Sequence, residues 1–127
     1  MSRRITPRRT TSPPTLASLR NQLRRFAEAR DWQQFHTPKN LAMALSVEAA
    51  ELLECFQWLT PEQSTQFSAR DRLAIEEEIA DVLLYLLRLS DVLDIDPLRA
   101  AQRKMTINAR KYPVALSRGS ARKYSRR

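Results

Sequence analysis

Two pairs of carboxylates, each pair spaced three residues apart, are the side chains of this chain best suited to chemistry. Glu48 and Glu51 form the first pair, and Glu78 and Asp81 form the second. Residues three apart on a helix are neighbours, so each pair can present its oxygens to one ion. An all-oxygen set suits Mg²⁺, with Mn²⁺ or Ca²⁺ as alternatives, and Mg²⁺ usually binds carboxylates together with substrate phosphates. A di-iron centre is disfavoured, because such bundles add Glu-x-x-His pairs and the single histidine, His36, lies outside both helical patterns.

Each carboxylate pair accompanies an apolar stripe with helical spacing. At about 100° per residue, Glu48 falls on the edge of the first stripe and Glu51 just beyond it. On the second helix, Glu78 falls on the edge of the apolar stripe and Asp81 lies further round on the same side. The stripes consist of Leu41, Leu45, Leu52, Phe56 and Leu59, and of Ile75, Val82, Leu86, Leu89 and Leu93. If the stripes pack together, four carboxylates converge and must be neutralised by protons or a cation. The alternative is that these acids only solvate the helix faces.

Capping signals divide the chain into four predicted helices, at about residues 16–30, 38–59, 69–91 and 97–112. Each follows a residue whose side chain can accept hydrogen bonds from the first turn, and two begin with proline at the first helical position. The predicted N-caps are Thr15, Thr37, Ser68 and Asp96. The chain has one glycine and many Ala, Leu, Arg and Glu residues, which also favours helices.

The fourth predicted helix has an apolar face, which we expect to point inward. That face contains Leu98, Ala101, Met105 and Ile107 or Asn108. The expected fold is therefore all-α, a four-helix bundle in which the two central helices carry the carboxylate pairs.

The length of 127 residues fits one small domain, predicted at residues 15–113. Residues 1–14 are rich in Arg, Ser, Thr and Pro and are expected to form a disordered basic tail, with a transit peptide as the alternative. Residues 114–127 are expected to be a basic C-terminal extension. The net charge of +8 is concentrated at these ends and favours anionic partners, either nucleic acid or small phosphorylated ligands.

Cysteine usage and hydropathy bear on the compartment. Cys55 is the only cysteine, so no intramolecular disulfide can form and an intracellular, cytoplasmic location is expected. No apolar run approaches the roughly 18 residues that span a bilayer, so no membrane partner is expected.

Aromatic residues near the carboxylates are candidates for binding a base. Tyr85 lies one turn beyond Asp81, and with Trp32, Phe35 and Trp58 it is a candidate wall of a stacking slot. Ordinary core packing is the alternative for these rings, and we favour it for Phe35. His36, near Trp32, either hydrogen-bonds the base or caps local backbone.

A row of polar residues on the fourth helix is a candidate for binding phosphate. Lys104, Asn108 and Lys111 are spaced four and then three residues apart, so they share one helix face. A solvated basic face is the alternative interpretation.

These residues together resemble a known family. From about residue 16 to residue 124 the chain is similar to the MazG-like, all-α nucleoside triphosphate pyrophosphohydrolases, most closely to their dCTP pyrophosphatase branch. The resemblance is carried by Arg30-Asp31-Trp32 with Gln34-Phe35-His36, Glu48-x-x-Glu51 with Phe56-Gln57-Trp58, Glu78-x-x-Asp81-Val82-Leu83-x-Tyr85, Lys104-Met105-x-x-Asn108-x-x-Lys111-Tyr112-Pro113, and Leu116-Ser117-Arg118-Gly119-Ser120-Ala121.

The resemblance implies Mg²⁺-dependent hydrolysis between the α and β phosphates of a nucleotide, and a role in cleansing the nucleotide pool. It implies that all four carboxylates hold the metal and that one of them, for which we favour Glu51, activates water. The base would lie between aromatic residues with His36 nearby, and the polar row of the fourth helix would face the phosphates. It also implies a homotetramer built as a dimer of dimers. The alternatives are a basic nucleic-acid-binding module, which we favour less, and a purely structural helical assembly.

Overall fold

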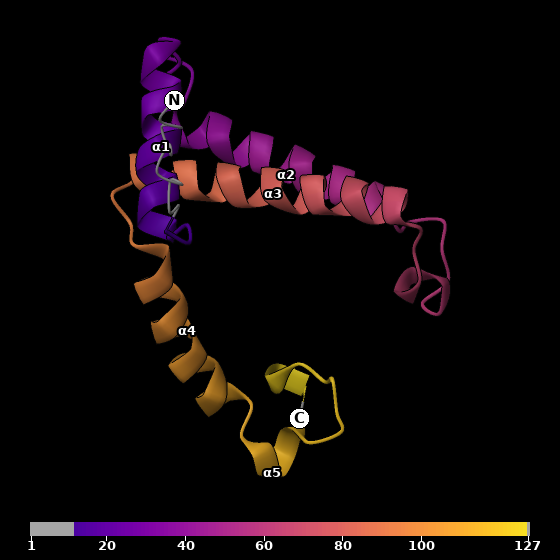
Figure 1. The fold of residues 1–127 in the computed structure, drawn as a ribbon. Coiled ribbons are helices and arrows are strands. Elements are labelled where there is room, and N and C mark those ends of the chain that lie inside the picture. The colour runs from indigo at the N-terminus through magenta and orange to yellow at the C-terminus, as the bar shows by residue number, and fades with distance from the viewer. Residues whose placement is uncertain (1–11, 127) are drawn as a thin grey trace, which may run out of the picture.

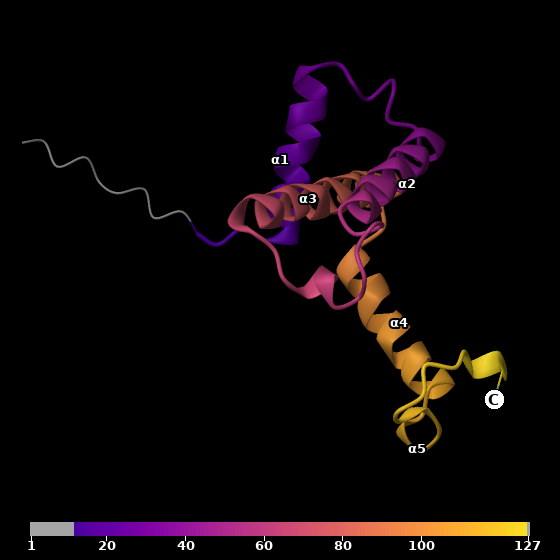
Figure 2. The same ribbon diagram turned by 90° about the vertical axis from the view of Figure 1, so that its right-hand side faces the viewer.

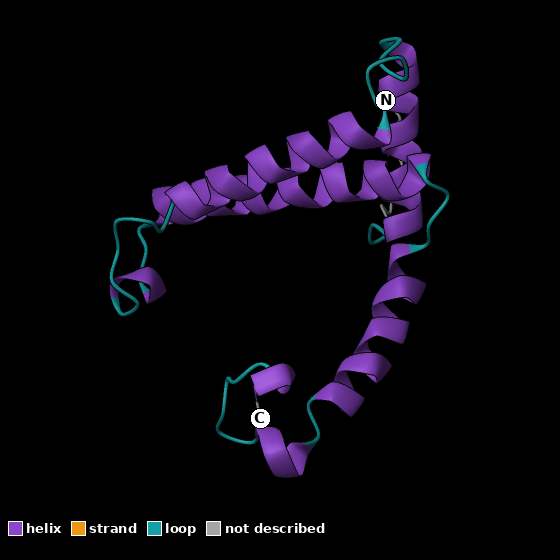
Figure 3. Cartoon of the chain, turned by 180° about the vertical axis from the view of Figure 1, so that it is seen from behind, coloured by secondary structure: helices purple, strands orange, loops and turns teal. Residues whose placement is uncertain are grey.

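Helices and loops make up the whole of the described chain. The computed structural model describes residues 12–126, and within them there is no strand (Figure 3). The predicted all-α class is therefore confirmed. Most of the predicted N-terminal tail, residues 1–11, lies outside the described residues.

The first two helices begin at the predicted caps. Helix α1 (Leu16–Ala29) begins with a capping box, because the Thr15 hydroxyl accepts from the Ser18 N–H at 3.0 Å and the Ser18 hydroxyl accepts from the Thr15 N–H at 2.9 Å. Helix α2 (Pro38–Glu54) begins where the Thr37 hydroxyl accepts from the Asn40 N–H at 3.2 Å. In each case a side chain satisfies a backbone donor that the first turn leaves free.

The two later helices follow the same rule. The Ser68 hydroxyl accepts from the Asp71 N–H at 3.1 Å at the start of α3 (Ala69–Val92). The Asp96 carboxylate accepts from the N–H groups of Leu98 and Arg99 at the start of α4 (Pro97–Lys111). Three short turns complete the described structure: η1 (Gln63–Thr65), α5 (Val114–Ser117) and η2 (Tyr124–Arg126).

The predicted end of the second helix was wrong by about one turn. We expected it to reach about Leu59, but α2 ends at Glu54. Beyond that point the backbone forms tighter bonds between residues three apart, with the Cys55 N–H bonded to the Leu52 carbonyl at 3.2 Å and the Phe56 N–H bonded to the Leu53 carbonyl at 2.9 Å. The apolar stripe therefore continues past the end of the helix.

Helices α2 and α3 form an antiparallel pair, and α1 crosses one end of this pair (Figures 1 and 2). The most extensive contact is between α2 and α3, followed by that between α1 and α3. Ala27, Leu41 and Leu87, one from each helix, are the buried apolar residues of the described chain. This packing brings the carboxylate-bearing faces of α2 and α3 together.

Helix α4 leads away from the other three helices (Figure 1). The face that we expected to point inward is exposed in the single chain: Leu98 is 61% exposed and Met105 is 69% exposed. The change of direction follows a left-handed Asp94 (φ 55°), where the Ile95 N–H bonds the Ser90 carbonyl at 2.8 Å and closes the end of α3. Three of the four predicted bundle helices thus pack together within one chain, and α4 does not join them.

None of the described helices is long and apolar enough to cross a membrane. The longest, α3, carries charged residues through its length.

Candidate active site

Three carboxylates meet where α2 packs against α3. Glu48 comes from α2, and Glu78 and Asp81 come from α3, and one ligand oxygen from each lies within 4.8 Å of the others. The three-residue spacing places both α3 carboxylates on the side that faces α2. We call these three residues the carboxylate cluster.

Burial makes the cluster electrostatically unfavourable on its own. Oxygen Oε2 of Glu48 and oxygen Oε2 of Glu78 are buried, and no described group donates a hydrogen bond to either. Desolvation, then hydrogen bonding with Glu51 and the charges of the neighbouring acids, raises the pKa of Glu48 to about 7. Desolvation and the charges of Glu51 and Asp81 raise the pKa of Glu78. Each cause disfavours the ionised form, so the site favours a bound proton or a cation.

Glu51 lies directly beside the cluster, without belonging to the closest set of three. It interacts with both Glu48 and Glu78, since it is a cause of the raised pKa of each. The structure therefore brings all four predicted metal ligands to one place.

The donor set fits a hard divalent cation. All the available ligand atoms are carboxylate oxygens, and two of them are buried without a partner. Such oxygens match Mg²⁺ or Mn²⁺ better than a softer metal. Glu48, Glu51, Glu78 and Asp81 are the residues that would hold it.

An aromatic cavity of about 180 Å³ adjoins the cluster. Three of the predicted base-binding residues, Trp32, His36 and Tyr85, line it. Asp81 lines it as well, so a residue of the carboxylate cluster also forms part of the cavity wall. Phe26 completes the aromatic side, with its ring 5.7 Å from that of Trp32 in an edge-on arrangement.

The end of α1 fixes the position of Trp32. Asp31 adopts a left-handed conformation (φ 53°), which aspartate tolerates better than most residues. The Trp32 N–H then bonds the Ala27 carbonyl at 3.0 Å, and the Asp31 N–H bonds the Glu28 carbonyl at 3.1 Å. These two bonds form a Schellman motif that turns the chain back and carries Trp32 onto the cavity.

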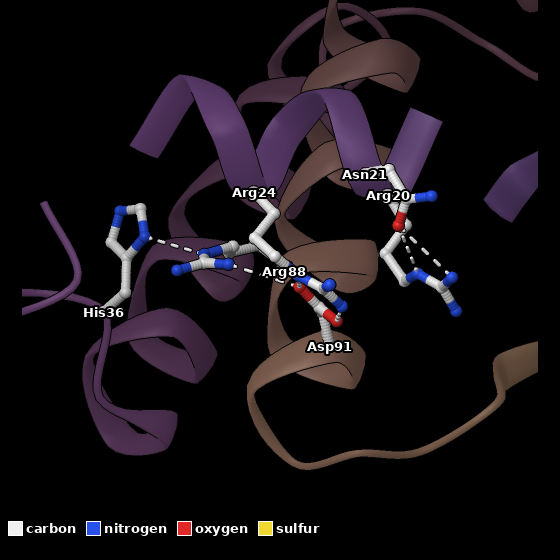
Figure 4. A network of polar contacts seen from close by, with 6 residues as sticks. All are labelled: Arg20, Asn21, Arg24, His36, Arg88 and Asp91. Carbon is white, nitrogen blue, oxygen red and sulfur yellow. Dashed lines mark hydrogen bonds and ion pairs between the residues drawn. The ribbon is translucent and has the colours of Figure 1, made fainter. Parts of the chain in front are cut away.

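A chain of polar contacts at the wall of the cavity was missed in the sequence analysis, and two of its members, His36 and Arg88, line the cavity. Arg24 of α1 pairs with Asp91 of α3, Asp91 pairs with Arg88, and Arg88 donates to His36 (Figure 4). The available signal was the spacing of Asp81, Tyr85 and Arg88, four and then three residues apart, which places the arginine on the same face as the predicted site.

The remaining predicted site residues lie elsewhere in the single chain. Trp58 follows the end of α2 and is 86% exposed. Lys104, Asn108 and Lys111 lie on α4, which leads away from the site, and the Lys111 ammonium sits 4.9 Å from the centre of the Tyr124 ring. None of these four lines the cavity or belongs to the cluster.

Comparisons with known proteins agree with the fold. A family model described as the MazG-like family matches residues 43–126. The chain is 46% identical to dCTP pyrophosphatase 1 of Bos taurus over 117 residues, covering 91% of this chain and 69% of that protein. It is 47% identical to the Homo sapiens protein of the same name over 114 residues, covering 88% and 67%. A crystal structure of a pyrophosphatase from Archaeoglobus fulgidus superposes with a TM-score of 0.74 at 47% identity, covering 81% of this chain and 96% of that one.

The chain therefore belongs to the MazG-like family, alongside its dCTP pyrophosphatases. The resemblance that its motifs indicated is confirmed.

Proposed function

We propose that this protein hydrolyses dCTP and closely related cytosine deoxynucleotides with Mg²⁺, cleaving the bond between the α and β phosphates to give dCMP and pyrophosphate. The enzyme class, a nucleotide pyrophosphohydrolase, follows from the family and from the names of the relatives. The base, the bond and the metal are the parts that we propose, with cleansing of the cytoplasmic nucleotide pool as the role.

The observation that carries the proposal is the junction at Asp81. Asp81 belongs to the carboxylate cluster, which has two buried oxygens without a hydrogen-bond partner. Asp81 also lines the cavity, together with Trp32 and Tyr85. Aromatic walls suit the stacking of a base, and a carboxylate set suits a cation that binds phosphates. One nucleotide can therefore occupy both halves of the site.

The residues of the site have separate roles in the proposed reaction. When bound, Mg²⁺ neutralises phosphate charge and stabilises the developing negative charge. Glu51 orients the attacking water and accepts its proton at a carboxylate oxygen. The water oxygen bonds to phosphorus as the bridging P–O bond between the α and β phosphates breaks, and pyrophosphate departs. Trp32 and Tyr85 hold the base, which fixes the triphosphate relative to Glu51.

Product analysis tests the proposed reaction. The purified protein is incubated with each common dNTP and NTP and with 5-methyl-dCTP, in Mg²⁺ or in EDTA, and the products are separated. We expect dCMP and pyrophosphate from dCTP in Mg²⁺ and no products in EDTA. Formation of dCDP and phosphate would contradict the proposed bond. Absence of any turnover would favour the nucleic-acid-binding alternative, which predicts DNA binding that weakens steeply with salt and persists in EDTA.

Removal of the Trp32 ring is expected to weaken dCTP binding. We expect Trp32→Ala to raise KM for dCTP by about tenfold or more, because stacking of a base on an aromatic ring contributes about 1–3 kcal/mol. Phe35→Ala is the matched control, since Phe35 lies in the same connection, is exposed and does not line the cavity. Steady-state kinetics of both variants check the prediction. Equal KM values for wild type and Trp32→Ala would remove Trp32 from the binding site.

Assembly into a homotetramer is part of the proposal. Helix α4 presents exposed apolar side chains such as Leu98 and Met105, and burial of such a face between copies is favourable. The same helix carries Lys104, Asn108 and Lys111, which could meet substrate phosphates only if α4 packs onto a site within the assembly. The proposed tetramer thus accounts for both features.

A charge on the exposed face of α4 is expected to disrupt this assembly. We expect wild type to elute as a tetramer in size-exclusion chromatography with light scattering, and Met105→Asp to shift it to smaller species with lower activity. Arg103→Asp, a charge change at a neighbouring exposed position, is the control for charge alone. A monomeric wild type with full activity would contradict the proposed assembly.

A further inference from the structure

His36 receives a hydrogen bond that determines which of its ring nitrogens carries the proton. The Nε atom of Arg88 donates to Nδ1 of His36 at 3.0 Å (Figure 4). A guanidinium has donors only and stays charged in proteins, so Nδ1 must be the acceptor. In a neutral imidazole the other nitrogen, Nε2, then carries the hydrogen.

Arg88 is held firmly in this role. It is 7% exposed, and its NH1 atom donates to the Asp91 carboxylate at 3.3 Å. The Asp91 side chain is 8% exposed and also accepts from Nε of Arg24 at 2.9 Å, so α1 and α3 both secure the carboxylate. Two charged partners that are this buried are costly to separate, because each would be left desolvated without its counter-ion.

His36 and Arg88 both line the aromatic cavity. The His36 ring lines the cavity with Trp32, whose ring lies 6.1 Å away and edge-on. Figure 4 shows the second ring nitrogen on the side away from Arg88. Within residues 12–126, no group accepts a hydrogen bond from Nε2. Partial burial, and then the positive charge of Arg88, lower the pKa of His36, which keeps the ring neutral.

We propose that Arg88 is a positioning residue that locks His36 as the Nε2–H tautomer, so that the cavity wall presents a fixed hydrogen-bond donor to the acceptor edge of the cytosine base. Cytosine offers N3 and O2 as ring-edge acceptors. A ring free to exchange tautomers would present the donor only part of the time. The identity of the base rests on the proposed function, whereas the tautomer rests on the contacts of Arg88 and His36 alone.

Nitrogen NMR of the imidazole tests the tautomer without any substrate. His36 is the only histidine in the chain, so an untagged, ¹⁵N-histidine-labelled sample gives one pair of ring signals. At neutral pH we expect Nδ1 to resonate as an unprotonated, hydrogen-bonded nitrogen and Nε2 as a protonated one. In Arg88→Met we expect both signals to move toward the averaged values of exchanging tautomers. A proton on Nδ1 in wild type, or averaged signals there, would overturn the proposal even if the variant did not fold.

A double-mutant cycle tests whether Arg88 acts through His36. We expect Arg88→Met to raise KM for dCTP about five- to tenfold with little change in kcat, the effect of losing one oriented hydrogen bond. In a His36→Phe background the same change should have no further effect on KM. With His36 present, Arg88→Lys should have a lower KM than Arg88→Met, because lysine can still donate a hydrogen bond to the imidazole. Arg72→Met, which removes an exposed ion pair with Glu76, is the control and should behave as wild type.

The two possible failures are distinguishable. An equal rise in KM from Arg88→Met in both backgrounds would show a structural role for Arg88 and overturn the positioning proposal while leaving the reaction intact. An enzyme with no activity on any nucleotide would contradict the proposed function and the cytosine part of this inference. The NMR measurement would still decide the tautomer.

Discussion

Replacement of Glu51 by glutamine is expected to lower kcat for dCTP by at least about 100-fold, the usual contribution of a positioned general base. The amide keeps the size of the side chain and can still orient water, but it cannot accept a proton. The substitution also reduces the number of negatively charged ligands from four to three, leaving Glu48, Glu78 and Asp81. The affinity for Mg²⁺ should therefore fall as well. Steady-state kinetics at saturating Mg²⁺ separate the loss in kcat from the weaker metal binding.

The control for this variant is Glu77→Gln on α3. Glu77 is exposed and adjoins Glu78 in sequence, but it does not belong to the carboxylate cluster. It should retain wild-type kcat and the same Mg²⁺ requirement. If Glu51→Gln keeps more than about a tenth of wild-type kcat, the proton must pass to another carboxylate or directly to solvent. Glu78→Gln and Asp81→Asn would then be the next variants to compare.

The carboxylate site could be predicted from sequence because each helix carries its own local signals. Thr15, Thr37, Ser68 and Asp96 accept hydrogen bonds from nearby backbone, so they fix the helix starts without tertiary help. The apolar stripes determine which faces of α2 and α3 pack, and the three-residue spacing then places Glu48, Glu78 and Asp81 at the same contact. The spacing of apolar residues and the capping residues are properties of a single helix, so they can be recognised in the sequence before the fold is known.

The polar contacts of Arg88 could not be predicted in the same way. A single arginine among leucines of the third helix resembles an ordinary solvated side chain. It is buried where α1 crosses α3, and there Arg24 of α1 and Arg88 of α3 both pair with Asp91 (Figure 4). The crossing of two helices depends on the packing of their surfaces and is not encoded in the period of either one.

The direction of α4 was unpredictable for a related reason. An apolar face such as that of Leu98 and Met105 predicts burial but does not say whether the covering surface belongs to the same chain. The same limit applies to the row of polar residues on α4, whose position relative to the carboxylates depends on how copies assemble. Trp58 differs again, because α2 ends at Glu54 and Trp58, in the turn that follows, is exposed in the single chain.

Binding of Mg²⁺ is expected to release protons and to tighten as the pH rises toward 7. The pKa of Glu48 in the metal-free protein is about 7, against an ordinary value of 4.5, and that of Glu78 is also raised. Below pH 7 a cation must displace a proton from the cluster, so its apparent affinity should increase by up to about tenfold per pH unit for each proton displaced. Calorimetry in two buffers of different ionisation enthalpy measures the number of protons released.

The same carboxylate governs the stability of the metal-free protein. Because the folded-state pKa of Glu48 exceeds the unfolded value, folding takes up a proton between pH 4.5 and about 7. The contribution of Glu48 to the free energy of unfolding is therefore greatest below pH 4.5 and is lost as the pH rises through 7. Added Mg²⁺ should restore it, and a concentration 100 times Kd corresponds to about 2.7 kcal/mol and a rise of several degrees in Tm.

Glu48→Gln separates these effects, because an amide neither titrates nor repels its neighbours. At pH above 7 and without metal, this variant should have a higher Tm than wild type, since the repulsion among the acids is reduced. It should also lose most of the stabilisation by Mg²⁺, because one ligand and one charge are gone. Glu77→Gln again serves as the control and should follow wild type in both respects. Stabilisation by Mg²⁺ that is independent of pH and unchanged in Glu48→Gln would show that the metal binds away from the carboxylate cluster, and Glu51 would then have no metal-bound phosphate to act upon.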